Sequence, residues 1–183
     1  MASPAFDRLG RTNRHGIRQA LRSMATSALP ARLLQVRTRD SRPLFTFDDG
    51  PHPDHTPRIL DTLATAGVKA EFYMIGAAAE RHPDLVRRVA DEGHLIGNHT
   101  WSHPDAGTLD GAAYLADVQR CRLLLEELSG HQVRRFRPPH GHLTMRSAIG
   151  LWRAGMQIVL WNVDPKDYAA TAPDEILDFA GRA

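Results

Sequence analysis

The chain has 183 residues, of which 42% are hydrophobic and 24% are charged, and its formal net charge is +2. This composition is ordinary for a globular protein, and the length suits a single domain with a sizeable core. The single cysteine excludes an intramolecular disulfide, and no apolar run approaches the length of a membrane-spanning helix.

The positive charge is concentrated in residues 1–42, which contain nine arginines and only two aspartates. Their balance of +7 leaves −5 for the rest of the chain. We expect residues 1–42 to form an Arg-rich, solvated N-terminal extension, with room for an extra strand at its end. We expect residues 43–183 to form the main domain.

The extension also bears on partners and location. A basic segment can contact nucleic acid or a membrane surface, but this one has no aromatic beyond Phe6 to stack on bases. We therefore expect no nucleic-acid partner. The extension lacks the continuous apolar core of a secretory signal peptide, which favours a cytoplasmic protein.

Five short segments rich in aromatic and β-branched residues predict strands, because each is bounded by Gly, Pro or polar turns. They are residues 44–47, 70–75, 94–98, 134–137 and 157–161.

Segments with the apolar periodicity of helices separate these strands. They are residues 57–67, 82–93, 112–130 and 145–155, and each ends at a glycine; a fifth such segment covers 172–183. Cys121 lies within one of them, and we expect it to pack as a core residue. Repeated strand and helix units predict an α/β fold with a parallel sheet, either open or closed into a barrel.

Polar and metal-binding residues follow four of the five predicted strands. These segments are "DDG" (48–50), "NHTWSH" (98–103), "RPPHG" (137–141) and "NVDPKDY" (162–168). In such folds the functional groups collect at the carboxyl ends of the strands. The pattern therefore predicts one site built from four strand ends.

Two histidines and a carboxylate predict a metal centre at this site. His99 and His103 are four residues apart, a spacing that places both rings on one side of a helical turn. Together with Asp49 they form a set of ligands common for catalytic divalent metals, with positions left open for water and substrate. The alternative for Asp48 and Asp49 is an ordinary polar turn after a strand.

Asp48 is expected to remain outside the metal ligands as a general base that acts on a water whose pKa the ion has lowered. A cation also removes the repulsion between the adjacent charges of Asp48 and Asp49. Arg137 can hold Asp48 through a paired hydrogen bond, and Asp167 can in turn hold Arg137. The alternative for these residues is an ordinary surface ion pair, which contributes little.

The segment after Arg137 is expected to be rigid. Pro138 and Pro139 restrict the backbone and Gly141 permits a turn, so the backbone N–H of His140 can be directed at an oxyanion. We expect Pro138, Trp161 and Tyr168 to line a small substrate pocket. Packing in the core is the alternative for Trp161.

Four segments in this order resemble the first four motifs of the NodB-homology polysaccharide deacetylases, which form carbohydrate esterase family four. They are "TFDDGP" (46–51), "HTWSH" (99–103), "FRPPHG" (136–141) and "WNVDPKDY" (161–168). The resemblance covers roughly residues 43–183. It implies an irregular (β/α) barrel that removes N-acetyl, sometimes O-acetyl, groups from sugars with a bound divalent metal, usually zinc or cobalt.

Carried over residue by residue, the resemblance implies that Asp49, His99 and His103 bind the metal and that Asp48 is the catalytic base. It further implies that Arg137 orients this base and that Asp167 secures Arg137. His140 stands where the family usually has a tyrosine whose backbone amide stabilises the tetrahedral intermediate. The backbone N–H of His140 can still take the role of the tyrosine amide, because that role does not depend on the side chain.

The chain departs from the family pattern at two places. Tyr168 stands where the fourth motif usually ends in Trp. The fifth motif, a Leu-x-His whose histidine is the family's general acid, is due after residues 172–183, where the sequence stops. We therefore expect a domain shortened at its C-terminal end, an incomplete barrel and reduced activity.

The function expected from these features is metal-dependent removal of acetyl groups from an amino-sugar polysaccharide or oligosaccharide, with zinc as the expected metal and cobalt as the alternative. A second hypothesis places the same chemistry on a small non-sugar amide, because fold and metal do not fix the substrate. A third is a catalytically impaired glycan-binding protein.

Overall fold

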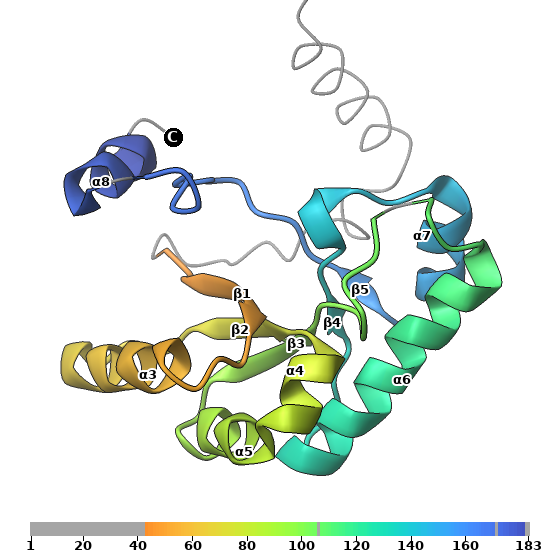
Figure 1. The fold of residues 1–183 in the computed structure, drawn as a ribbon, viewed down its shortest axis with the longest axis horizontal. Helices are drawn as coiled ribbons and strands as arrows, with labels where there is room; N and C mark the ends of the chain where they lie inside the picture. The colour runs from red at the N-terminus through yellow and green to blue at the C-terminus, as the bar shows by residue number, and fades with distance from the viewer. Residues whose placement is uncertain (1–42, 106, 171, 182–183) are drawn as a thin grey trace, which may run out of the picture.

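The computed structural model describes residues 43–105, 107–170 and 172–181 (Figure 1). The Arg-rich extension 1–42, with its expected extra strand, lies outside the described residues. The described residues contain five strands: β1 (Thr46–Gly50), β2 (Glu71–Met74), β3 (Leu95–Asn98), β4 (Arg135–Phe136) and β5 (Gln157–Ile158). Each overlaps one of the five strands predicted from the sequence.

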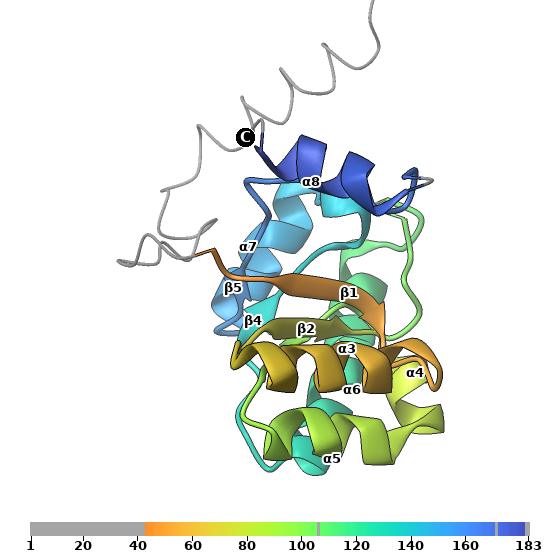
Figure 2. The same ribbon diagram turned by 90° about the vertical axis from the view of Figure 1, so that its left-hand side faces the viewer.

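The strands form one parallel sheet in the order β1-β2-β3-β4-β5. The predicted α/β fold with a parallel sheet is therefore confirmed. Each strand lies beside the previous one, and right-handed crossovers in such a series place the connecting helices on the same face of the sheet. In Figure 2, α3 (His55–Ala66) and α5 (Pro83–Asp91) both lie below β1 and β2.

The remaining helices are α4 (Gly76–Arg81), α6 (Gly111–Ser129), α7 (Met145–Arg153) and α8 (Pro173–Gly181), with a short 3-10 turn, η1, at Pro139–Gly141. The predicted helix ends are correct at Gly67 and Gly130, which have φ of 64° and 70° and donate their N–H groups to the preceding turn. Only residues without a Cβ adopt this left-handed conformation readily. The sequence did not predict α4, because six residues, three of them Ala, carry no helical period.

Buried apolar side chains between the sheet and its helices form the core. One cluster joins Phe72 and Met74 of β2 to Leu60 of α3 and Leu125 of α6, and a second joins Phe136 of β4 to α6 and α7. Cys121 is fully buried in the first cluster, where desolvation raises the pKa of its thiol to about 12. The prediction that it is a packed helix residue is confirmed.

The opposite face of the sheet is polar. Glu71 and Tyr73 alternate with the core residues of β2 and are completely buried, and Glu71 pairs with Arg135 of β4 at 2.9 Å. The guanidinium of Arg137 lies 4.0 Å from the centre of the Tyr73 ring. Charged side chains on this face therefore extend from the interior of the sheet to the carboxyl ends of the strands.

No helix among the described residues is both long enough and apolar enough to cross a membrane.

Gly97→Ala tests how tightly this polar face is packed. A Cβ at Gly97 of β3 would lie 2.5 Å from Cε1 of Tyr73, whose ring is buried beneath Arg137. Because this ring has little room to move, we expect the substitution to lower the free energy of unfolding by about 1–3 kcal/mol in a denaturant titration.

Gly111→Ala is the matched control, because the nearest atoms there, at 3.1 Å, belong to the flexible side chain of Arg146. We expect the control to leave stability unchanged or to raise it, since Ala favours a helix over Gly. Equal stability of the two variants would show that Tyr73 is free to shift.

Candidate metal and catalytic site

A β-bulge in β1 positions the two adjacent carboxylates. Phe47 pairs with Phe72 and Gly50 pairs with Met74, so three steps along β1 oppose two steps along β2. The additional residue is accommodated with Asp49 at a φ of 67°. Asp48 and Asp49 thus lie inside the strand, whereas the sequence predicted that the strand ends before them. Bulges of this kind redirect side chains next to functional sites.

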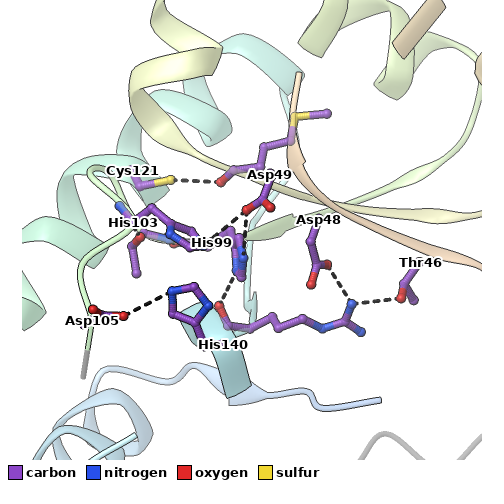
Figure 3. A network of polar contacts seen from close by, with 12 residues as sticks. Thr46, Asp48, Asp49, His99, His103, Asp105, Cys121 and His140 are labelled. Atoms are coloured by element: carbon purple, nitrogen blue, oxygen red, sulfur yellow. Dashed lines mark hydrogen bonds and ion pairs between the residues drawn. The ribbon is translucent and has the colours of Figure 1, made fainter. Parts of the chain in front are cut away.

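Asp49 faces the two predicted histidines (Figure 3). Its Oδ1 lies 3.4 Å from Nε2 of His99 and 3.2 Å from Nε2 of His103. The ligand atoms of the three residues all lie within 4.8 Å of one another. The side chain of His99 is buried and that of Asp49 is largely exposed, so the cluster opens to solvent on one side.

The histidine pair does not lie on a helical turn, which corrects the expectation from its spacing. Residues 99–103 form a loop after β3 in which Thr100 and His103 have φ of 72° and 54°. The two rings meet edge to face with 5.0 Å between their centres. A loop with two left-handed residues therefore brings the rings together, as a helix would have done.

One hydrogen bond fixes how His99 faces Asp49. Its Nδ1 lies 2.7 Å from the backbone oxygen of Arg137. Because a carbonyl only accepts, Nδ1 carries a proton, and a neutral ring then directs the lone pair of Nε2 at the carboxylate. Such an arrangement requires positive charge between Nε2 and Asp49, either a second proton on the ring or a cation. A carbonyl behind a ligating histidine is a common arrangement in metal sites.

The pKa values of Asp49 and His103 are shifted toward the protonation states that bind a cation. With a second proton, on Nε2, His99 donates a hydrogen bond that lowers the pKa of the Asp49 carboxyl, and burial opposes this effect. Burial lowers the pKa of His103, which the negative charge of Asp49 partly offsets. The first shift favours a carboxylate and the second a neutral imidazole.

Asp48 is bound by Arg137, as the sequence predicted, but through one hydrogen bond instead of a pair. Nη1 of Arg137 donates to Oδ1 of Asp48 at 2.7 Å and to Oγ1 of Thr46 at 2.8 Å. Nε of Arg137 lies 3.4 Å from the backbone oxygen of Val159. The Arg137 side chain is only 3% exposed, so this is not a surface ion pair. Sequence analysis missed Thr46, two residues before Asp48 and on the same side of the strand.

The expected support of Arg137 by Asp167 is not found. Within the described ranges, no hydrogen bond or ion pair joins the two residues, and Asp167 is exposed in the segment before α8. A local turn explains the difference, because Lys166 has a φ of 54° and donates its N–H to the side chain of Asp164. Thr46 and Val159 contact Arg137 in place of Asp167.

His140 lies at the mouth of the site with a left-handed backbone, φ 55°. Its Nε2 is 3.1 Å from Oδ1 of Asp105, and its ring centre is 4.9 Å from that of His103. Sequence analysis missed Asp105, for which no motif signal exists.

The three expected pocket residues differ in their surroundings. Pro138 is buried. Trp161 is half-buried, with its ring 5.6 Å from the guanidinium of Arg137. Tyr168 is 78% exposed. A pocket formed by these three residues stays a prediction.

Metal binding should depend on pH in a defined direction. The pKa of Asp49 is lowered from 3.8, so its carboxylate is ionised at neutral pH, and the pKa of His103 is lowered from 6.5, so its ring is neutral there. We expect zinc affinity to be constant from about pH 8 to 7 and to fall at acidic pH, below 6.5, where protons compete for the His103 imidazole. Calorimetric titrations across this range measure it, and affinity that rises on acidification would contradict the assigned ligands.

Comparisons with known proteins agree with this geometry. The family model for polysaccharide deacetylase matches residues 35–159. The chain is 38% identical over 132 residues to a peptidoglycan-N-acetylglucosamine deacetylase of Bacillus cereus, covering 72% of this chain and 48% of that protein. It is also 38% identical over 144 residues to a chitooligosaccharide deacetylase of Rhizobium leguminosarum bv. trifolii, covering 76% and 65%.

A solved structure shares the fold. The crystal structure of a peptidoglycan N-acetylglucosamine deacetylase superimposes with a TM-score of 0.76 and 34% identity, covering 80% of this chain and 68% of that one. The chain spans about half and about two thirds of the lengths of these two curated relatives. The matched family model and these similarities show that the chain belongs to the polysaccharide deacetylase family.

Proposed function

We propose that the chain hydrolyses N-acetyl groups of an amino-sugar glycan with the help of a divalent metal. The observation that carries the proposal is the cluster of Asp49, His99 and His103 beside the pair formed by Asp48 and Arg137. The names of the relatives support the substrate class, since they denote deacetylases of peptidoglycan N-acetylglucosamine and of chitooligosaccharides.

The residues at the site fit a metal such as zinc. Two imidazole nitrogens and one carboxylate oxygen are ligands that zinc prefers, and cobalt is the alternative. The proton on Nδ1 of His99 leaves Nε2 available, and the solvent-exposed side of Asp49 leaves room for further ligands. Held by these three residues, zinc would act as a Lewis acid, which would polarise the acetyl carbonyl and lower the pKa of a water.

The residues of the chain divide the remaining tasks. Asp48 accepts the proton of the attacking water, and Arg137 orients Asp48 and balances its charge. The buried position of Arg137, fixed by Thr46 and the Tyr73 ring, keeps this base in one place. The backbone N–H of His140 is our proposed donor to the oxyanion that forms when water adds to the carbonyl.

The proposal predicts separate effects for metal ligand and base. Asp49→Ala should abolish binding of zinc in a calorimetric titration, because it removes the carboxylate shared by both histidines. Asp48→Asn should retain zinc but lower the rate of acetate release from N-acetylglucosamine oligomers by about 10²- to 10⁴-fold, because the base is lost.

Asp54→Ala is a suitable control, since this exposed aspartate lies close in sequence and its side chain caps no backbone N–H of α3. It should leave zinc binding and acetate release unchanged. Tight zinc binding by the Asp49→Ala variant would contradict the proposed metal site. Unchanged acetate release by the Asp48→Asn variant would contradict the proposed base.

A further inference from the structure

We propose that Asp117 of α6 is a positioning residue for the metal loop, which we define as residues 99–103. No part of α6 belongs to the metal ligands, yet the carboxylate of Asp117 contacts the middle of the loop. The inference rests on the metal site of the proposed function and extends it to the groups that hold His99 and His103 in place.

Asp117 accepts three hydrogen bonds from the metal loop. Its Oδ1 accepts from the backbone N–H of Trp101 at 2.6 Å and from that of Ser102 at 3.4 Å. Its Oδ2 accepts from the hydroxyl of Ser102 at 2.6 Å. Trp101 and Ser102 lie between the two metal-binding histidines, so Asp117 fixes the segment that determines their separation.

The metal loop needs such support because most of its backbone N–H groups have no backbone acceptor. Its five N–H groups are all bonded, yet only that of His99 donates to a backbone oxygen, at Met74. The others donate to side chains: Thr100 to Asn98, Trp101 and Ser102 to Asp117, and His103 to Thr100. Two of the five residues are left-handed without being glycine, a conformation that persists only where surrounding contacts enforce it.

Helices on both sides hold the loop. The first two N–H groups of α4, at Gly76 and Ala77, donate to the backbone oxygens of Thr100 and Trp101. On the α6 side, Asn98 donates its side-chain N–H to the backbone oxygen of Val118, beside Asp117. The guanidinium of Arg120 lies over the Trp101 ring, 3.4 Å from its centre. Asp117 supplies the acceptors on the α6 side that the loop amides require.

The test is the affinity for Co²⁺ and the visible absorption spectrum of the Co²⁺-loaded chain. Asp117→Ala should weaken Co²⁺ binding by about 10- to 100-fold, the range found when residues behind metal ligands are removed. Asp117→Asn should weaken it less, because its side-chain oxygen still accepts from Trp101. Ser102→Ala, which removes one of the three hydrogen bonds, should have the smallest effect. These two milder variants keep the test valid if Asp117→Ala fails to fold.

Asp110→Ala is the matched control on the same helix. Asp110 accepts from the N–H groups of Ala112 and Ala113 at the start of α6, so its removal destabilises the helix without touching the metal loop. We expect this control to lower the melting temperature while leaving Co²⁺ affinity and the Co²⁺ spectrum unchanged. The Asp117 variants should change the spectrum, because a loosened loop alters the ligand geometry around the ion.

The possible outcomes separate the inference from the proposed function. Co²⁺ binding by the parent chain, with weaker binding and an altered spectrum only in the Asp117 and Ser102 variants, supports the inference. If Asp117→Ala keeps the affinity and spectrum of the parent chain, the inference is overturned while the metal site stands. The same holds if Asp110→Ala loses as much Co²⁺ affinity as Asp117→Ala. A parent chain that binds no Co²⁺ overturns the metal site and the inference together.

Discussion

The bulge in β1 is the constraint on which the site depends. Phe47 packs against the core between the sheet and its helices. In a regular strand Asp49 would follow Phe47 to that apolar side, since side chains alternate. The additional residue in β1 instead lets Asp49 reach the two histidines, while Asp48 stays on the side of Thr46 and binds Arg137. Two adjacent carboxylates thereby obtain different partners, which explains how like charges can stand side by side in β1.

The two faces of the sheet contribute differently to this arrangement. Apolar side chains on the helix-covered face supply the core, whereas the other face carries Tyr73 and Arg137 in contact with each other. Arg137 links the two halves of the site, because its side chain binds Asp48 and its backbone oxygen accepts from His99. A buried arginine with several partners is costly to disturb, so the orientations of the proposed base and of a proposed metal ligand depend on one residue directly after β4.

Sequence reasoning predicted which polar residues lie together, because Asp48, Asp49, His99, His103 and Arg137 all follow predicted strands. It could not predict the local conformation of the backbone. A spacing of four suggested a helical turn for the histidines, but left-handed residues at Thr100 and His103 bring the rings together in a loop. Asp117 and Asn98 carry no signal of their own, because their roles depend on how α6 packs beside the end of β3. Asp167 was expected at Arg137 from motif order, which does not reveal the local turn at Lys166.

X-ray absorption spectroscopy of the zinc-loaded chain tests the central claim most directly, because it reports the ligands themselves. The account predicts scattering from two imidazoles and a carboxylate oxygen at about 2.0–2.2 Å from zinc, with the signal of one imidazole lost in His103→Ala. A shell made only of oxygen ligands, or one that His103→Ala leaves unchanged, would contradict it.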